Sequence, residues 1–476
     1  MNTSIPQLAD LPRSCVHLVG GAVRDSLMGK DPKDLDFVIV GMSPDDVFTS
    51  LSRCGHVEEI ESRNFGVFKF TPQGQTEIID VALPRRDRWT GLTYTDMIPE
   101  IGVSLEEDLG RRDFTINAMA QSLDGDLVDP FGGQKDLQSR LIRAVGDPRQ
   151  RFDEDPSRIL RGLRLACQLD FEIEEETFRT MREMASEVVR LTEDGETRVS
   201  AEVVGTEFLR GFATNPVRLI SLWDEVGLLD LLLPELSALK GVPQPEEYHS
   251  EGDVWIHTML ALGNLRGGDG PIPLRPDAIH AKLAVLLHDV GKPSVLQMPE
   301  ETGDRIRFSN HDKIGGKMVG EIVDRMRLSV FPHDHPLHVE RERLAFLVGH
   351  HMLRLDRGCN VKLSTLEKHF FSPEERGGEL LAVMQADLSA ALRADGKPDL
   401  GCHSALLEKL GLVANSLRFR VKERGLPHLL NGLEIMEIAG IPPGPEVGRI
   451  KDALRDLHLA GELTTAEEAR EWLVRR

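Results

Sequence analysis

Val16-His17-Leu18-Val19-Gly20-Gly21-Ala22-Val23-Arg24-Asp25 is followed a few residues later by Lys33-Asp34-Leu35-Asp36. The first four residues are mostly apolar and predict a strand that ends at two glycines. Glycine adopts backbone conformations that a Cβ would forbid, so we expect a tight turn at Gly20 and Gly21. We predict a short helix over residues 22–28, which Gly29 ends, and a second strand over residues 34–40.

Two carboxylates occupy alternate positions of that second strand. Side chains two positions apart on a strand face the same side, so we expect Asp34 and Asp36 to stand together beside the glycine turn. Adjacent carboxylates repel each other unless a cation lies between them, and such oxygen pairs suit Mg²⁺ that is shared with substrate phosphates. Gly20 and Gly21 also let a phosphate approach the backbone amides. An Asp-x-Asp pair in an acidic chain is ordinarily a solvated turn, but the combination of both strings predicts a triphosphate site with a metal clamp.

Length and composition set limits on the class of protein. The 476 residues are enough for about three domains, and a content of 40% hydrophobic but 5% aromatic residues predicts mainly aliphatic cores. The net charge of −21 argues against a general polyanion binder, although a local basic face can still bind RNA. No apolar run approaches the ~18 residues of a membrane span, and the N-terminus lacks the features of a signal peptide. We therefore expect a cytoplasmic protein, with reduced thiols because its cysteines are scattered: Cys15, Cys54, Cys167, Cys359 and Cys402.

The strings at residues 18–25 and 33–36 resemble those of the tRNA nucleotidyltransferase and poly(A) polymerase family, in its bacterial-type (class II) branch. Two later strings extend the resemblance: Arg111-Arg112-Asp113-Phe114-Thr115-Ile116-Asn117-Ala118 and Asp129-Pro130-Phe131-Gly132-Gly133. The resemblance implies an α+β fold, in which a nucleotidyltransferase mixed sheet with flanking helices precedes all-α neck, HD and tail domains. It also implies that Asp34 and Asp36 hold two Mg²⁺ ions. The residues implied to hold the triphosphate are Gly20, Gly21, Arg24, Arg112, Arg161 and Arg164.

Residues 65–70 and 77–82 read as strands that extend the sheet. Asp80 lies on the second of them, ahead of Arg85, at the place where the family resemblance implies a third catalytic carboxylate. The alternative for Asp80 is a surface aspartate at a strand end. Residues 84–104 have few helix signals and predict a long mobile loop, which is often functional. A long loop here resembles family members that add the terminal adenosine.

The helical region predicted over residues 146–240 contains an aspartate and three arginines at regular spacing. Arg158, Arg161 and Arg164 are spaced by three, so they share one helix face, and Asp155 precedes Arg158 by three. An ordinary salt-bridged surface helix would look the same. The family resemblance implies instead that Asp155 and Arg158 act as a protein template for the incoming base. Cytosine and adenine each offer an amino donor beside a ring-nitrogen acceptor, whereas uracil and guanine would leave polar groups unpaired.

A second set of chemistry-bearing residues begins near residue 255. The order His257, His288-Asp289, Asp387 resembles the HD phosphohydrolase superfamily, and further histidines lie at 311, 350 and 351. Mixed imidazole and carboxylate ligands suit Mn²⁺, Ni²⁺, Fe²⁺ or Mg²⁺ better than structural zinc. We therefore expect a second divalent metal site that activates water against a phosphoester; a retained but inactive helical domain is the alternative.

These observations predict a template-independent tRNA nucleotidyltransferase that adds CMP and AMP from CTP and ATP to tRNA 3′ ends. Its expected partners are tRNA and the two nucleotides, without a membrane, and its expected state is a monomer or a homodimer. The alternatives are a poly(A) polymerase, an A-adding or CC-adding enzyme, and a phosphohydrolase whose head only docks tRNA. A basic run at residues 418–424 is either an RNA contact or a solvated helix face. The predicted domains are a catalytic head (1–145), a neck (146–240), an HD domain (245–395) and a tRNA-binding tail (396–476).

Overall fold

The computed structural model describes residues 8, 11–32, 34–58, 66–89, 97–267, 271–353, 361–420 and 428–475, with backbone alone at 418–420. The chain forms two compact units, residues 1–232 and 233–476, which are described separately here. Among these residues, no helix combines the length and the apolar character needed to cross a bilayer. The predicted division into four domains stays a prediction.

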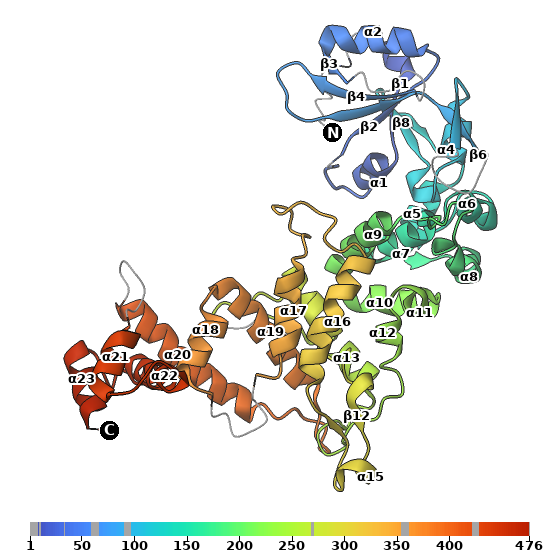
Figure 1. Cartoon of the computed structure of the whole chain (residues 1–476). Helices are drawn as coiled ribbons and strands as arrows, with labels where there is room; N and C mark the ends of the chain where they lie inside the picture. Colours follow the sequence, from blue (N-terminus) through green and yellow to red (C-terminus); the bar gives the residue numbers. More distant parts are fainter. Residues whose placement is uncertain are drawn as a thin grey trace. The chain divides into compact units, whose positions relative to one another are not determined.

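A seven-stranded mixed sheet forms the centre of the first unit, in the order β3-β4-β5-β2-β1-β8-β9 (Figure 1). Of its pairings, β2 with β5 is parallel and the others are antiparallel. Its strands are β1 (Val16–Val19), β2 (Asp36–Ile39), β3 (Gly55–Val57), β4 (Val67–Pro72), β5 (Ile79–Ala82), β8 (Ala120–Ser122) and β9 (Leu127–Val128). The α+β prediction is confirmed.

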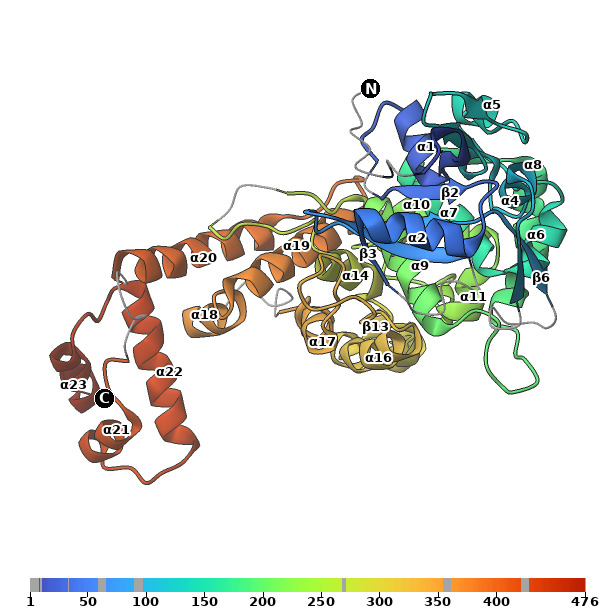
Figure 2. The same ribbon diagram turned by 90° about the horizontal axis from the view of Figure 1, so that it is seen from above.

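The two faces of the sheet bury different side chains, and this sorting places the acidic residues. Phe37 and Ile39 of β2 pack into one core together with Val47 and Leu51 of helix α2 (Pro44–Cys54), which lies along this face in both views (Figures 1 and 2). Val38 packs into the core of the opposite face. Since side chains alternate along a strand, Asp36 shares the face of Val38 and turns away from α2.

The remaining helices of the first unit surround the sheet and continue beyond it. Helix α1 follows the glycine turn and ends before Gly29, whose φ is +72°, as predicted. The helices are α1 (Gly21–Leu27), α4 (Leu105–Gly110), α5 (Gly133–Gln138), α6 (Pro148–Glu154), α7 (Ser157–Leu169), α8 (Glu175–Met184), α9 (Ala201–Thr214), α10 (Pro216–Glu225) and α11 (Leu228–Leu232). A short parallel pair, β10 (Leu141–Ile142) with β11 (Glu172–Ile173), interrupts them.

The predicted loop over residues 84–104 is wrong over much of its length. Strands β6 (Arg85–Trp89) and β7 (Met97–Ile101) pair antiparallel over five residues each. The charged residues of this segment led to the prediction of a loop. Pairing between the two strands nevertheless satisfies the backbone hydrogen-bonding groups, and it does not require an apolar face. Residues 90–96, at the tip between the two strands, lie outside the described residues.

The second unit consists mainly of helices, with one short hairpin formed by β12 (Leu296–Gln297) and β13 (Arg307–Phe308). Its helices are α12 (Pro234–Ser237), α13 (Val254–Gly263), α14 (Ile279–Leu287), α15 (Pro299–Thr302), α16 (His311–Arg325), α17 (Arg341–His350), α18 (Leu363–Phe370), α19 (Glu374–Ala390), α20 (Gly401–Arg420), α21 (Gly432–Ala439), α22 (Pro445–Ala460) and α23 (Ala466–Val474). Helix α23 is capped at Thr465 by a capping box with Glu468. The side chains of the basic run at 418–424 lie outside the described residues.

Candidate functional site

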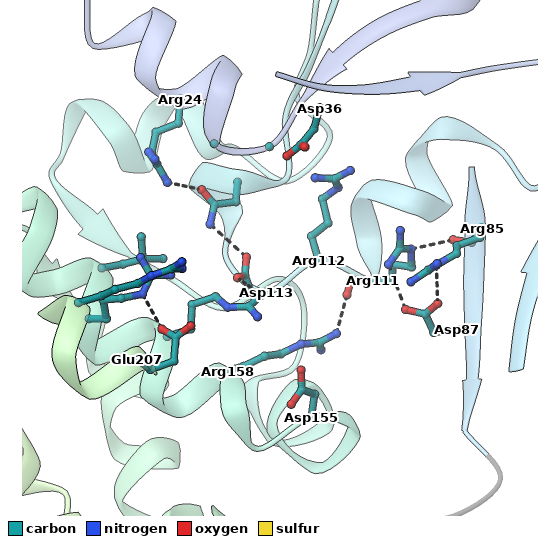
Figure 3. Close-up of a pocket in the computed structure, with 17 residues that line it drawn as sticks. Arg24, Asp36, Arg85, Asp87, Arg111, Arg112, Asp113, Asp155, Arg158 and Glu207 are labelled. Atoms are coloured by element: carbon teal, nitrogen blue, oxygen red, sulfur yellow. Dashed lines mark hydrogen bonds and ion pairs between the residues drawn. The ribbon is translucent and has the colours of Figure 1, made fainter. Parts of the chain in front are cut away.

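A pocket of about 540 Å³ in the first unit lies where the glycine turn, strand β2, helix α4 and helix α7 meet (Figure 3). Arginines outnumber carboxylates in its lining, so the pocket is locally basic although the chain is acidic. Such a pocket favours a polyanionic ligand. It is lined by Gly20, Gly21, Arg24, Asp36, Arg85, Asp87, Arg111, Arg112, Asp113, Asn117, Asp155, Arg158, Arg161, Arg164, Leu165, Glu207 and Arg210.

Gly20 lets the backbone approach the charged wall of this pocket. Its φ is +73°, a conformation that L side chains rarely adopt. A Cβ at this position would lie 2.9 Å from Nη1 of Arg112 and 4.0 Å from Oδ2 of Asp36. The backbone conformation therefore favours glycine, and a Cβ here would displace the guanidinium of Arg112.

A chain of polar contacts joins the glycine turn to helix α7 across the pocket (Figure 3). Arg24 Nη1 donates to Asn117 Oδ1 at 2.7 Å, and Asn117 Nδ2 donates to Asp113 Oδ1 at 3.2 Å. Asp113 Oδ2 in turn accepts from Arg161 Nη1 at 3.2 Å. Burial opposes the charge on Asp113, but Arg161 and these hydrogen bonds outweigh it and lower the pKa of the carboxyl group. The network fixes two of the predicted triphosphate ligands relative to each other.

Arg112 is held from behind and points into the pocket. Its Nη2 donates to Asp108 Oδ2 at 3.3 Å, and Asp108 is fully buried. Burial alone would raise the pKa of the Asp108 carboxyl group. The positive charges of Arg111 and Arg112 outweigh this effect, so the pKa lies below its ordinary value. Arg112 Nε is buried and has no hydrogen-bond partner among the residues described. The guanidinium of Arg112 is thus held in position by Asp108 and still has N–H groups that can donate to a ligand.

Three predicted catalytic carboxylates take different positions. Asp36 opens strand β2 and lines the pocket, and Asp80 is its register partner on β5. Asp34 precedes the strand and is exposed, so the prediction that both carboxylates of the pair lie on one strand is wrong. Burial, then the charges of Asp80 and Asp34, raise the pKa of Asp36, while Arg112 and Lys69 lower it.

The raised pKa of Asp36 indicates whether Asp36 and its neighbours could bind a cation. Asp80 Oδ1 lies 3.0 Å from Lys69 Nζ, but the Asp36 carboxyl group retains an unfavourable charge environment. A divalent cation beside Asp36 would relieve it, and carboxylate oxygens are the ligands that Mg²⁺ prefers. The arrangement therefore fits the predicted metal.

All four residues predicted to recognise the base or the phosphates from the neck line the pocket: Asp155, Arg158, Arg161 and Arg164. Arg158 and Asp155 do not pair with each other, however. Arg158 Nη1 lies 3.1 Å from Glu154 Oε2, and its Nη2 donates to the Arg111 carbonyl at 2.8 Å. Asp155 Oδ1 accepts from the amide and the hydroxyl of Ser157.

The second unit contains a buried cluster of the predicted HD residues, with two additional histidines. His257 comes from α13, His288 and Asp289 directly follow α14, and Asp387 belongs to α19. His311 begins α16 and His351 follows α17. Close groups of ligand atoms that could hold a metal are His257 with His288 and Asp289, and Asp289 with His311 and His351. His350 lies apart, stacked on Phe346.

The ring nitrogens of this cluster are arranged as in a metal site. His257 Nδ1 lies 2.8 Å from Glu251 Oε1, and His288 Nδ1 lies 2.7 Å from the Val285 carbonyl. A carbonyl oxygen can only accept, so His288 is protonated at Nδ1 and its Nε2 lone pair faces the cluster. His288 Nε2 is buried without a well-formed hydrogen bond to any described residue. It lies 3.1 Å from Asp289 Oδ2, and that oxygen also lies 2.7 Å from Lys292 Nζ.

The charges at His257 also agree with a cation. Burial opposes a positive charge there, but hydrogen bonds with Asp387 and Glu251 outweigh it and raise the pKa of His257 to about 9. A metal ion would take the place of the proton on Nε2, which lies 3.0 Å from Asp387 Oδ1. The residues thus fit the divalent metal that the sequence predicts.

Comparison with known proteins decides the family. A model of the poly A polymerase head domain matches residues 16–143. The multifunctional CCA protein of Alkalilimnicola ehrlichii is 36% identical over 397 residues, covering 80% of this chain and 86% of the relative. This chain belongs to the CCA-adding, class II nucleotidyltransferase family. The multifunctional CCA protein of Neisseria meningitidis serogroup B is 42% identical over 318 residues, covering 65% of this chain and 68% of the relative.

Solved structures support the fold of this CCA-adding family member. The Bacillus stearothermophilus CCA-adding enzyme in complex with CTP matches with a TM-score of 0.59 and 22% identity, covering 98% of this chain and 96% of that one. The Thermotoga maritima CCA-adding enzyme complexed with tRNA matches with a TM-score of 0.58 and 21% identity, covering 97% and 90%. At this identity the likeness shows the fold alone.

Several residues that line the pocket of this CCA-adding family member are not predicted from the sequence. Glu207 and Arg210 of α9 line the pocket, and Glu207 pairs with Arg164. Asp87 of β6 pairs with Arg85 at 3.0 Å and with Arg111 at 3.1 Å. Arg111 and Arg164 are distant in sequence from these acids, so no local spacing signals those two contacts.

Proposed function

We propose that this protein is a template-independent tRNA nucleotidyltransferase, which extends tRNA 3′ ends with CMP and AMP from CTP and ATP and releases pyrophosphate. The relationship to multifunctional CCA proteins along most of the chain is the observation that carries this proposal. A poly(A) polymerase is disfavoured because the relatives that match 80% and 65% of this chain are multifunctional CCA proteins.

The pocket residues have complementary roles in this reaction. Arg24, Arg112, Arg161 and Arg164 hold the triphosphate, with Gly20 and Gly21 letting it approach the backbone. Planar guanidinium groups bind phosphate oxygens with two parallel hydrogen bonds. Asp34, Asp36 and Asp80 hold Mg²⁺ at the phosphate end of the pocket. Two bound ions of this kind favour deprotonation of the attacking 3′-hydroxyl and stabilise the leaving pyrophosphate.

Base selection is assigned to Asp155 and Arg158 at the neck end of the pocket. An aspartate accepts from the amino group of cytosine or adenine, and an arginine donates to the adjacent ring nitrogen. Arg158 forms an ion pair with Glu154 and donates to the Arg111 carbonyl, and its side chain does not pair with that of Asp155. Binding of the base therefore requires Arg158 to give up one of these contacts. Its pairing with Glu154 is an ion pair between neighbours on consecutive helices, which a better-placed acceptor can replace.

The decisive experiment compares Asp36→Asn with Asp45→Asn. Asp36 shares the pocket face of the sheet, whereas Asp45 lies in the first turn of α2, which covers the other face. Incorporation of labelled CMP and AMP is measured on tRNA that ends before the first C, after one C, or after CC. Asp36→Asn should abolish incorporation on every substrate and Asp45→Asn should leave it intact. Wild-type protein that adds neither nucleotide would overturn the proposal, and addition to only some ends would identify an A-adding or CC-adding enzyme.

The buried HD cluster favours a second function, a metal-dependent phosphohydrolase in residues 233–476. His257, His288, Asp289 and Asp387 would hold a divalent ion, which supplies a polarised phosphoester and an activated water. Hydrolysis of a 2′,3′-cyclic nucleotide is the measurement. His288→Gln should abolish it without changing nucleotide addition, while Asp36→Asn should do the reverse. This reciprocal pattern also excludes a phosphohydrolase whose head merely docks tRNA.

A further inference from the structure

Glu207 is a buried acid in the wall of the pocket of the first unit. It lies on α9, is 8% exposed, and directs its carboxylate into the pocket (Figure 3). Its Oε2 accepts a hydrogen bond from Nε of Arg164 on α7. A negative charge in the wall of a site for a polyanion opposes ligand binding unless it serves another group. The pairing with Arg164 is the contact that accounts for an acid in this position.

Arg164 is held on two sides and keeps one donor group for a ligand. Its Nε donates to Glu207, and its Nη1 donates to Oε1 of Gln168, one turn later on the same helix. Nη2 has no partner among the residues that the structure describes. The side chain of Arg164 is 14% exposed and lines the pocket. The guanidinium therefore has a fixed orientation, with Nη2 available to a phosphate oxygen.

The close packing of α9 against α7 fixes the position of Glu207. A Cβ at Gly211 of α9 would lie 3.4 Å from Cα of Arg164, so the two backbones approach each other closely. Phe208 and Phe212 of α9 are buried, and their rings stack with centroids 5.2 Å apart. Glu207 precedes Phe208 and is therefore anchored with it. An anchored acid can orient an arginine side chain, which otherwise populates many rotamers.

We propose that Glu207 is a positioning residue for nucleotide binding, which holds the Arg164 guanidinium in the orientation that receives the triphosphate. The inference rests on the proposed role of Arg164 as a triphosphate ligand. Glu207 does not touch the nucleotide and acts through Arg164. Helix α9 thereby contributes to the nucleotide site, although no sequence motif described above includes it.

Preorganisation explains why a negative charge is tolerated beside a triphosphate. An arginine that is already oriented loses less side-chain entropy when it binds a ligand. Because the phosphate binds Nη2 and not Nε, Arg164 does not have to release Glu207. Without the acid, Arg164 keeps its charge but samples several orientations. The nucleotide affinity should then fall, whereas the chemical step at the 3′-hydroxyl does not depend on Glu207.

The test is a double-mutant cycle on Glu207 and Arg164 in the full-length protein. KM and kcat for CTP and ATP are measured on tRNA for the wild type, Glu207→Ala, Arg164→Met and the double variant. Glu207→Gln is the conservative variant, because its amide oxygen still accepts from Arg164. Glu176→Gln is the matched control, since Glu176 also pairs with an arginine but lies exposed on α8, outside the pocket lining. Circular dichroism and thermal unfolding check that each variant is folded.

We expect Glu207→Ala to raise KM for both nucleotides ~10-fold and to change kcat less than about twofold, since loss of uniform binding acts on KM. Glu207→Gln should raise KM only about threefold, because the hydrogen bond is kept but the charge is lost. In the Arg164→Met background, Glu207→Ala should raise KM by less than about twofold, because its partner is absent. Glu176→Gln should leave both constants unchanged.

The outcomes separate this inference from the proposed role of Arg164. A raised KM in Arg164→Met with a wild-type KM in Glu207→Ala would overturn the inference alone. A wild-type KM in Arg164→Met would overturn the role of Arg164 and the inference with it. A lower melting temperature and kcat in Glu207→Ala with an unchanged KM would show that Glu207 only stabilises the packing of α9. Multiplicative effects on KM in the cycle would show that Glu207 does not act through Arg164.

Discussion

The pocket of the first unit and the buried cluster of the second unit are built from different kinds of side chain, although both are proposed to act on phosphate groups. The pocket of the first unit is lined by long arginine side chains, most of which are already paired with carboxylates such as Asp108, Asp113 and Glu207. The cluster of the second unit uses short imidazole and carboxylate groups that are almost completely buried. Long, partly solvated cations can exchange one anion for another, which suits a large nucleotide that must enter and leave. Short buried ligands instead fix small cations that stay in place.

If nucleotide binding depends more on close approach to the backbone at Gly20 than on any single charge, replacing Gly20 should lower activity the most. We expect Gly20→Ala to lower kcat/KM for nucleotide addition ~100-fold, about 2.7 kcal/mol. The new Cβ would lie 2.9 Å from Arg112 Nη1 and would strain a φ of +73°. Steady-state kinetics with CTP and ATP measure the loss.

Gly74→Ala is the matched control, since Gly74 also has a positive φ of +81° but an added Cβ there meets no atom within 4 Å. Both substitutions place a Cβ at a positive φ, and Gly20 also has a ψ of −137°, so each costs about 1–3 kcal/mol of backbone strain. Only Gly20→Ala should impair catalysis. Equal kinetic losses in the two variants would mean that general destabilisation, and not the contact with Arg112, explains the effect.

The chemical nature of the pocket's cations is tested by Arg112→Lys. A lysine keeps the charge but loses the planar pair of donors that fits a phosphate. We expect kcat/KM to fall ~30-fold, mainly through weaker nucleotide binding. Arg88→Lys, on the exposed part of β6 outside the pocket lining, is the control. If Arg112→Lys has wild-type kinetics, Arg112 does not bind phosphate through its guanidinium geometry.

Many features of the fold and of the two sites can be predicted from the sequence, and those that cannot have identifiable physical causes. The glycine turn, the face shared by the neck arginines and the order of the HD residues depend on local spacing, which the chain itself carries. The pairing of β6 with β7 was missed because their charged residues carry no apolar alternation. Arg158 was matched to Asp155, three residues away, although Glu154, four residues away, pairs with it at 3.1 Å. Glu207 could not be found, because the packing of α9 against α7 brings it to Arg164.

The polar chain that joins the glycine turn to α7 should behave as a unit. Asn117→Ala removes the link between Arg24 and Asp113, which are held at 2.7 and 3.2 Å from the amide group. We expect a loss of ~10-fold in kcat/KM, since both neighbours keep their charges but lose their fixed orientation. Asp113→Asn should have a smaller effect in the Asn117→Ala background than in the wild type, because only the ion pair with Arg161 remains to be lost there. Multiplicative effects in this double-mutant cycle would show that the two residues act separately.

The last prediction concerns stability and not catalysis, at a histidine of the second unit that lies outside the metal cluster. His280 is buried, and its Nε2 accepts the Glu340 amide at 2.8 Å. Burial, then Arg343 and His338, lower the pKa of His280 to about 4. The unfolded state therefore binds more protons than the folded state below pH 6.5. This contribution to stability is complete above pH 6.5 and is lost as the pH falls toward 4, by up to about 3 kcal/mol.

Replacing this imidazole with a neutral group separates its contribution from that of the cluster histidines. His280→Gln keeps an acceptor near the Glu340 amide but does not titrate. The unfolding free energy of the wild type minus that of the variant, from urea unfolding at several pH values, should therefore fall between pH 6.5 and 4. The exposed His335, replaced by Gln, gives the comparison for a histidine that is not enclosed. A constant difference for His280→Gln would show that the pKa of His280 is the same in the folded and unfolded protein, and that burial in this unit does not lower the pKa of a histidine.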